Sequence, residues 1–139
     1  MILQETFHPA FAMAALTFVV WCRLYVVRIG EMRRRHISPQ SLADSAGVAA
    51  RLQDTRASDN FRNLFELPVL FYLALVVMAI FGLTTPTAAA LAWVFVVLRI
   101  VHSAIHCTYN RVMHRFVVYV AGALTLWALW AYLAIGLMR

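Results

Sequence analysis

The fold is decided by the stretch LFELPVLFYLALVVMAIFGL at residues 64–83, in which Glu66 is the single charged side chain. A transmembrane helix needs about 20 apolar residues, whereas a strand of a membrane β-barrel needs about half that number in an alternating pattern. The stretch has the helical length and shows no alternation. It therefore predicts a helix that spans a membrane.

Further apolar stretches of similar length occur at residues 7–27, 88–105 and 116–137. The sequence is 63% hydrophobic and 13% charged, which is too apolar for a water-soluble domain of 139 residues. No basic cluster precedes the first stretch and no cleavage site follows it, so we expect it to remain as a span. The sequence thus predicts an all-α integral membrane protein in which residues 1–139 form one domain, a bundle of four transmembrane helices.

The twelve basic residues are all arginine, and most of them lie in two loops. Seven lie on or beside a polar loop at residues 28–58, two lie in the loop at residues 107–115, and the turn at residues 82–86 has no charge. The positive-inside rule places both Arg-rich loops in the cytoplasm. The flanking arginines and anionic lipid explain the net charge of +6, so we expect membrane lipids and no nucleic acid as partners.

Local signals predict the boundaries of the helices. Gly47 is expected to break any helix in the polar loop, and Ser58 or Asp59 to cap the start of the second helix. Pro68 should loosen that helix, because proline lacks a backbone N–H. The short turn at residues 82–86 predicts an antiparallel hairpin of the second and third spans.

Four polar residues at the start of the second span follow helical spacing. Asp59, Arg62, Asn63 and Glu66 stand at positions i, i+3, i+4 and i+7. Residues three and four apart lie on one face of a helix. We therefore expect a single polar stripe that enters the membrane from the cytoplasmic side.

The third span repeats this spacing with Arg99, His102 and His106, and the fourth begins with Arg115 and Tyr119 at i and i+4. Ionisable side chains within a bilayer are costly, so they usually face a bundle interior, a wet cavity or each other. Because the third span runs antiparallel to the second, its end returns to the same side. We therefore expect three helices to bring their polar groups together near the cytoplasmic face.

Simpler explanations of these residues remain open. Arg62 and Glu66 have the spacing of an i, i+4 ion pair, and Arg99 is placed to neutralise Glu66 between helices. His102 and His106 have the spacing of a helical metal-ligand pair, but two ligands do not complete a zinc site, so we expect no metal. The cations outnumber the one carboxylate at this depth, and their surplus favours an anionic ligand.

The stretch DNFRNLFELP at residues 59–68 resembles the signature of the MAPEG family, the membrane-associated proteins of eicosanoid and glutathione metabolism. The similarity extends to Arg99 and His102 in the third span and to Arg115 and Tyr119 in the fourth, with spacings like those of the family's prostaglandin synthase branch. The chain is similar to bacterial-type members, which implies a location in a bacterial inner membrane.

The resemblance implies a homotrimer of four-helix subunits, with glutathione bound as a co-substrate between neighbouring subunits near the cytoplasmic face. It also implies an arginine ligand at the end of the first span, where Arg35 aligns best and Arg33 and Arg34 are alternatives. Carried over residue by residue, the other positions that match the family's glutathione site are Arg62, Asn63, Glu66, His102, Arg115 and Tyr119.

The residue types themselves suit this ligand. Glutathione carries two carboxylates, an ammonium group and a thiol, and its recognition requires several guanidinium groups and one carboxylate. Arg99 and His106 extend this set as further glutathione-binding residues. A cation beside the sulfur favours the reactive thiolate, and we assign this catalytic role to Arg115, with Tyr119 as a hydrogen-bond donor one helical turn on.

Two positions depart from the family's pattern. His106 stands where the family often has tyrosine, and Phe116 stands where the prostaglandin synthase branch has serine. We therefore expect a transferase or peroxidase that acts on a lipophilic electrophile, rather than a prostaglandin isomerase. The alternative is a non-catalytic membrane scaffold or accessory subunit that keeps the fold.

Overall fold

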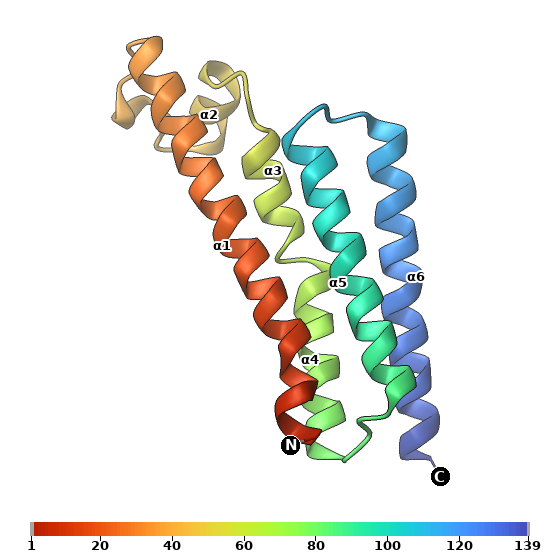
Figure 1. Ribbon diagram of the computed structural model, residues 1–139. Coiled ribbons are helices and arrows are strands. Elements are labelled where there is room, and N and C mark those ends of the chain that lie inside the picture. Colours follow the sequence, from red (N-terminus) through yellow and green to blue (C-terminus); the bar gives the residue numbers. More distant parts are fainter. Residues whose placement is uncertain (1, 139) are drawn as a thin grey trace.

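The computed structural model describes residues 2–138 and the side chains of residues 6–138. Four helical segments in this range are long and apolar enough to cross a membrane, which confirms the predicted bundle. Figure 1 shows them as one bundle whose spans alternate in direction. The first span is α1 (Ile2–Arg34), the second is divided into α3 (Arg56–Asn63) and α4 (Leu67–Ile80), the third is α5 (Pro86–Cys107) and the fourth is α6 (Val112–Leu137).

Helix α1 is longer than the sequence predicts. The apolar stretch ends at residue 27, but the helix continues to Arg34. An i, i+4 ion pair between Glu31 and Arg35 (2.8 Å) joins its last turn. Basic residues at this end also interact favourably with the negative end of the helix dipole. The polar loop predicted at residues 28–58 is therefore a shorter connection at residues 35–55.

This connection is itself partly helical. Gly47, predicted as a break, lies inside a helix, and its N–H donates to Oδ1 of the capping residue Asp44 (2.6 Å). A Cβ on Gly47 would lie 2.2 Å from the carbonyl oxygen of Ser41, so glycine is needed here for close packing and not to end a helix. The two short elements of the connection are the 3-10 helix η1 (Pro39–Leu42) and α2 (Ser45–Arg51).

The start of α3 also differs from the prediction. The sequence predicts Ser58 or Asp59 as the cap, but Thr55 occupies this position. The Thr55 hydroxyl donates to Oδ2 of Asp59 (2.8 Å). Asp59 therefore lies in the first turn of α3, where a carboxylate interacts favourably with the positive end of the helix dipole.

The second span is broken at residues 64–66. Glu66 has φ −95° and ψ −104°, outside the helical region. Pro68 explains the break, because it lacks the N–H that would bond to the carbonyl of Leu64 and its ring would clash with that carbonyl in a continuous helix. In the first turn of α4, Pro68 needs no N–H partner. The prediction of one polar stripe is therefore wrong, because Glu66 does not continue the helical register of α3.

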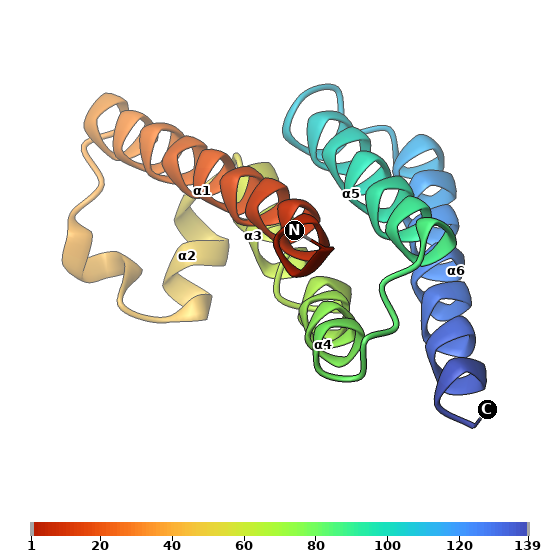
Figure 2. The same cartoon turned by 60° about the horizontal axis from the view of Figure 1, so that its bottom comes forward.

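The break changes the neighbours of the second span. Helix α3 packs against α1 and α5, whereas α4 packs against α1 and α6. Helices α4 and α5 run in opposite directions across a short turn, but they are not among the closely packed pairs and lie across the bundle from each other (Figure 2). The side chains of Phe71 and Phe95 bridge them, with ring centres 4.7 Å apart. The predicted antiparallel hairpin of these spans is confirmed. Its two helices lie on a diagonal of the bundle, and α1 and α6 each pack against both of them.

Apolar side chains fill the bundle and also cover its outside. Phe71, Phe95 and Leu129 are fully buried in the core. On the surface, Phe18 is 64% exposed and Val26 is 73% exposed. Exposed apolar area of this extent marks contact with lipid or with another protein.

Candidate functional site

The charged connections lie at one end of the bundle, which we call the Arg-rich end. It contains residues 35–55, between α1 and α3, and residues 108–111, between α5 and α6. Figure 1 shows these connections at the top, opposite the turn between α4 and α5 and the two chain ends. The two Arg-rich loops therefore share one side of the bundle.

Arg99 of α5 is a buried cation that makes no hydrogen bond of ordinary geometry to the described residues, although the Tyr119 side chain lies close enough to interact with it. Only 1% of the residue is exposed, and none of its three guanidinium nitrogens makes a hydrogen bond within the described chain. The guanidinium carbon lies 4.9 Å from the centre of the Tyr119 ring and 5.3 Å from that of Phe95. Glu66 is close enough to act on Arg99 electrostatically, without forming an ion pair. Buried charges are normally paired, so the guanidinium of Arg99 has unused hydrogen-bonding capacity.

The other residues predicted on α5 and α6 come together beside Arg99. His102 and His106 are 2% and 3% exposed, and their rings meet edge to face at 5.6 Å. The ring of His102 also lies 5.8 Å from that of Tyr119. Arg115, half-buried in the first turn of α6, donates from Nη1 to Nε2 of His106 (2.9 Å). The structure thus joins five of the predicted site residues in one cluster.

The remaining site residues of the second span lie toward the outside of the bundle. Arg62 and Glu66 are exposed and Asn63 is half-buried. Among residues 6–138, ion pairs form only between Glu31 and Arg35 and between Asp54 and Arg56. The Arg62–Glu66 pair and the Arg99–Glu66 pair that the sequence left open are therefore absent from this part of the chain.

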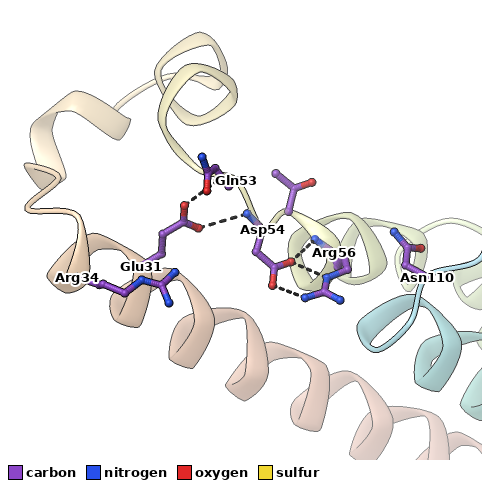
Figure 3. Close-up of a pocket in the computed structure, with 7 residues that line it drawn as sticks. Glu31, Arg34, Gln53, Asp54, Arg56 and Asn110 are labelled. Carbon is purple, nitrogen blue, oxygen red and sulfur yellow. Dashed lines mark hydrogen bonds and ion pairs between the residues drawn. The ribbon is translucent and has the colours of Figure 1, made fainter.

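Arg35 belongs to a separate cluster at the end of α1. It donates to Glu31 Oε1 (2.8 Å), and the buried carboxylate of Glu31 also accepts from the backbone N–H groups of Gln53 (2.8 Å) and Asp54 (3.3 Å). Figure 3 shows Glu31 directed from α1 toward these loop residues. The cluster borders a cavity of about 440 Å³, lined by Glu31, Arg34, Gln53, Asp54, Thr55, Arg56 and Asn110. The structure does not bring Arg35 into contact with the cluster around Arg99.

Asp54 and Arg56 form the second ion pair of this region. Arg56 donates from Nε (2.9 Å) and from Nη2 (2.7 Å) to the two carboxylate oxygens of Asp54. This bidentate contact holds the pKa of Asp54 below its usual value, against the opposing effect of burial. Arg56 also donates to the carbonyl of Thr108. The pair therefore fixes the start of α3 to the connection after α5.

The carbonyl groups at the end of α5 are satisfied by arginines from other helices. Arg23 of α1 donates to the carbonyl of Cys107 (2.5 Å), next to the Arg56 contact with Thr108. The last carbonyls of a helix lack partners within it and carry partial negative charge. Arg23 and Arg56 thus have a structural role. They do not belong to the surplus of cations that the sequence analysis attributed to an anionic ligand.

Asn60 is a buried polar residue that the sequence analysis did not select. Its Oδ1 accepts from Ser103 Oγ (3.3 Å), and its Nδ2 donates to the sulfur of Cys107 (3.5 Å). These contacts tie α3 to α5. The sequence signal was present, because Asn60 stands between polar residues at the start of a span, but its spacing excluded it from the predicted stripe.

Glu31 and Asn110 also contact predicted site residues, although the sequence did not identify them. Glu31 is an acidic residue four positions before Arg35, a spacing that predicts an ion pair. Asn110 has a positive φ of 49°, and asparagine adopts this conformation more readily than most residues. Its Oδ1 accepts from Arg115 Nη1 (2.8 Å), so it belongs to the site through Arg115.

The converging groups are mainly hydrogen-bond donors. No group of three or more His, Cys, Asp and Glu side chains in the described range is placed to hold a metal ion. The cluster instead offers the free guanidinium of Arg99, the partly free guanidinium of Arg115 and the phenol of Tyr119. Such donors recognise carboxylates and stabilise anionic sulfur.

Comparison with known proteins identifies the family. The model of the MAPEG family matches residues 6–135. Comparisons with curated proteins and with solved structures give no match. The matched range contains nearly all of the four spans and the whole cluster around Arg99. The chain therefore belongs to the MAPEG family and is an integral membrane protein built as a four-helix bundle.

Proposed function

We propose that this protein is a membrane-bound transferase or peroxidase that uses glutathione as co-substrate and acts on lipophilic electrophiles. The observation that carries the proposal is the guanidinium of Arg99, which is buried beside Tyr119 and makes neither an ion pair nor a hydrogen bond of ordinary geometry within the described chain. A buried unpaired charge destabilises a fold by roughly several kcal/mol unless a partner of opposite charge compensates it. A carboxylate of glutathione is a partner of the required charge.

The distribution of charges supports glutathione rather than a simple anion. Arg62 and Arg99 are cations without ion pairs in the described chain, and Glu66 is a carboxylate without one. Arg62 and Arg99 could each bind one carboxylate of the tripeptide, and Glu66 its ammonium group. Arg115 also forms no ion pair in this part of the chain and is left for the thiol. Arg62 and Glu66 face outward, so a site that uses them closes against a second subunit. We therefore include a homotrimer, with the site between subunits, in the proposal.

Arg115 and Tyr119 suit the reactive part of the site. A guanidinium beside the sulfur stabilises the thiolate, and a phenol donates a hydrogen bond to it. In a transferase, the thiolate sulfur then forms a bond to the electrophilic carbon while the leaving group departs with its bonding electrons. The apolar surface of the spans admits a substrate that dissolves in the bilayer.

The test is glutathione binding and conjugation by the purified protein in detergent, with a chlorodinitrobenzene as electrophile and cumene hydroperoxide as peroxide. Arg62→Ala and Glu66→Gln should each weaken glutathione binding about tenfold or more, because each removes one partner of a charged ligand group. Arg51→Ala is the control, since Arg51 is also an exposed arginine at the Arg-rich end. Light scattering should give a trimer.

Two outcomes would contradict this proposal. Unchanged glutathione affinity in both variants, with the oligomer intact, would leave Arg62 and Glu66 as surface charges. Glutathione binding without conjugation or peroxide reduction would favour the alternative, a non-catalytic scaffold that keeps the fold and the ligand.

A further inference from the structure

One nitrogen of Arg115 is held by two acceptors from different positions in the chain. Nη1 lies 2.9 Å from Nε2 of His106 and 2.8 Å from Oδ1 of Asn110. Each terminal nitrogen of a guanidinium carries two hydrogens, so these contacts use both hydrogens of Nη1. The two contacts at Nη1 therefore fix the orientation of the guanidinium plane. The three N–H groups on Nε and Nη2 remain available to donate to a ligand.

The backbone fixes the position of Asn110. The N–H of Asn110 donates to the carbonyl of Ile105 (2.9 Å), which closes the end of α5. The residue has a φ of 49°, in the left-handed region. Helices commonly end with such a residue, usually glycine and sometimes asparagine. The amide oxygen is thus positioned by the helix end and not by a flexible loop.

Arg115 also determines the protonation of His106. A guanidinium only donates, so Nε2 of His106 must be the acceptor and carry no proton. The neutral ring then carries its proton on Nδ1. This atom is buried and has no hydrogen-bond partner within the described chain. The ring itself is 3% exposed and packs edge to face on His102, which restricts its rotation.

We propose that His106 and Asn110 are positioning residues that clamp the guanidinium of Arg115 through Nη1, so that Nε and Nη2 face the glutathione sulfur in a fixed orientation. This inference rests on the proposed function, because it assigns the two residues a role in the same thiol chemistry. It gives His106, which stands where the family often has tyrosine, a role through Arg115 instead of direct contact with the ligand.

Orientation matters here because the cation acts at short range. A flexible arginine at the membrane surface samples many rotamers, and only a few of them place a donor at the sulfur. Holding a group in the reactive geometry before the reaction lowers the barrier, and a misplacement of about 1 Å costs up to about 100-fold in rate. Loss of either acceptor should therefore reduce turnover more than glutathione affinity.

The clamp is tested first without any ligand. Nitrogen-15 NMR of histidine-labelled protein should show that neutral His106 carries its proton on Nδ1. In Arg115→Met this preference should disappear, because the donor to Nε2 is gone. A proton on Nε2 in the wild-type protein would overturn the proposal.

The second test uses variants that differ only in the acceptor. His106→Leu and Asn110→Gly should each lower kcat about tenfold, change the KM for glutathione less than about threefold, and move the titration of the bound thiol to higher pH. His106→Gln and Asn110→Asp retain an acceptor and should restore most of the loss. Glycine suits the positive φ of Asn110, so Asn110→Gly removes the oxygen without straining the turn.

His114→Leu is the matched control, since His114 contacts Tyr109 (3.2 Å) and neither acceptor of the clamp. Equal losses in the leucine and glutamine variants, or a change confined to KM, would overturn the proposal. If wild-type protein binds no glutathione, the proposed function fails and so does the clamp's role in thiol chemistry. The NMR result then still decides separately whether the clamp exists.

Discussion

The guanidinium carbon of Arg99 lies 4.9 Å from the centre of the Tyr119 ring, so a cation buried by α5 is covered by an aromatic face from α6. A cation–π contact of this kind is worth about 2 kcal/mol when desolvated. Burial of a charge costs roughly several kcal/mol, so the aromatic face compensates only part of this cost. Arg99 is therefore expected to destabilise the fold as long as no anion binds its guanidinium.

Replacement of Arg99 by methionine should separate these effects. We expect Arg99→Met to unfold at the same temperature as the wild-type protein or higher, because the substitution removes a buried charge that no ion pair compensates and keeps a side chain of similar length. Glutathione affinity should fall about tenfold or more, since a carboxylate loses its charged partner. Thermal unfolding in detergent and calorimetric titration measure the two quantities. A clear decrease in unfolding temperature without glutathione would contradict the expectation.

Arg115→Ala should lower turnover more than it lowers glutathione affinity. The carboxylates of the ligand have other arginine partners, whereas the sulfur loses its adjacent cation. The pH at which the bound thiol ionises should rise toward the free cysteine value of about 8.5. Tyr119→Phe should give a smaller defect of the same kind, because it removes one hydrogen bond and no charge.

Thiolate absorbance as a function of pH measures this effect. Arg111→Ala is the control, because Arg111 is exposed on the loop before α6 and its side chain does not cap that helix. Identical titrations of wild-type protein and Arg115→Ala would show that Arg115 is a lipid or loop anchor.

The Asp54–Arg56 pair should make stability depend on pH on the acid side. The pKa of Asp54 is lowered in the folded protein by hydrogen bonds from Arg56, so its stabilising contribution is complete above the ordinary value of 3.8. It is lost as the pH falls through the lower folded-state pKa. Asp54→Asn should therefore unfold at a lower temperature near neutral pH, and the difference from wild type should shrink under strongly acidic conditions.

Unfolding temperatures across this pH range test the expectation. Arg56→Gln should lose at least as much stability near neutral pH, because it also removes the hydrogen bond to Thr108. The double variant should add little to the Arg56→Gln loss, because the Asp54 contact is already broken there. A constant difference between wild type and Asp54→Asn at every pH would mean that the carboxylate charge is not what stabilises the fold.

The orientation of the bundle follows from the arginines in the connections. A cysteine introduced at Thr85, in the uncharged turn before α5, should react with an impermeant thiol reagent added to intact cells from outside. A cysteine at Ser45, in the connection after α1, should react only after the membrane is opened. Reaction at Ser45 and not at Thr85 in intact cells would reverse the proposed topology.

The sequence alone determined the four spans, because a membrane helix depends on a local property, the length of an apolar stretch. It also determined that Arg99, His102 and His106 share one side of α5, since that helix contains no break and its period places residues three and four apart together. All three residues are buried in the structure.

Only the tertiary structure decided how these local elements meet. The prediction that Asp59 and Glu66 share one helical face was wrong, because Pro68 removes a backbone donor and the helix breaks before it. The contacts of Arg115 with His106 and of Glu31 with Gln53 join residues from different elements. Sequence spacing within one helix does not encode which helices become neighbours or how far one is turned toward the next. Those relations depend on the packing of whole side-chain surfaces, and they decide which arginines are satisfied by the protein and which are free for a ligand.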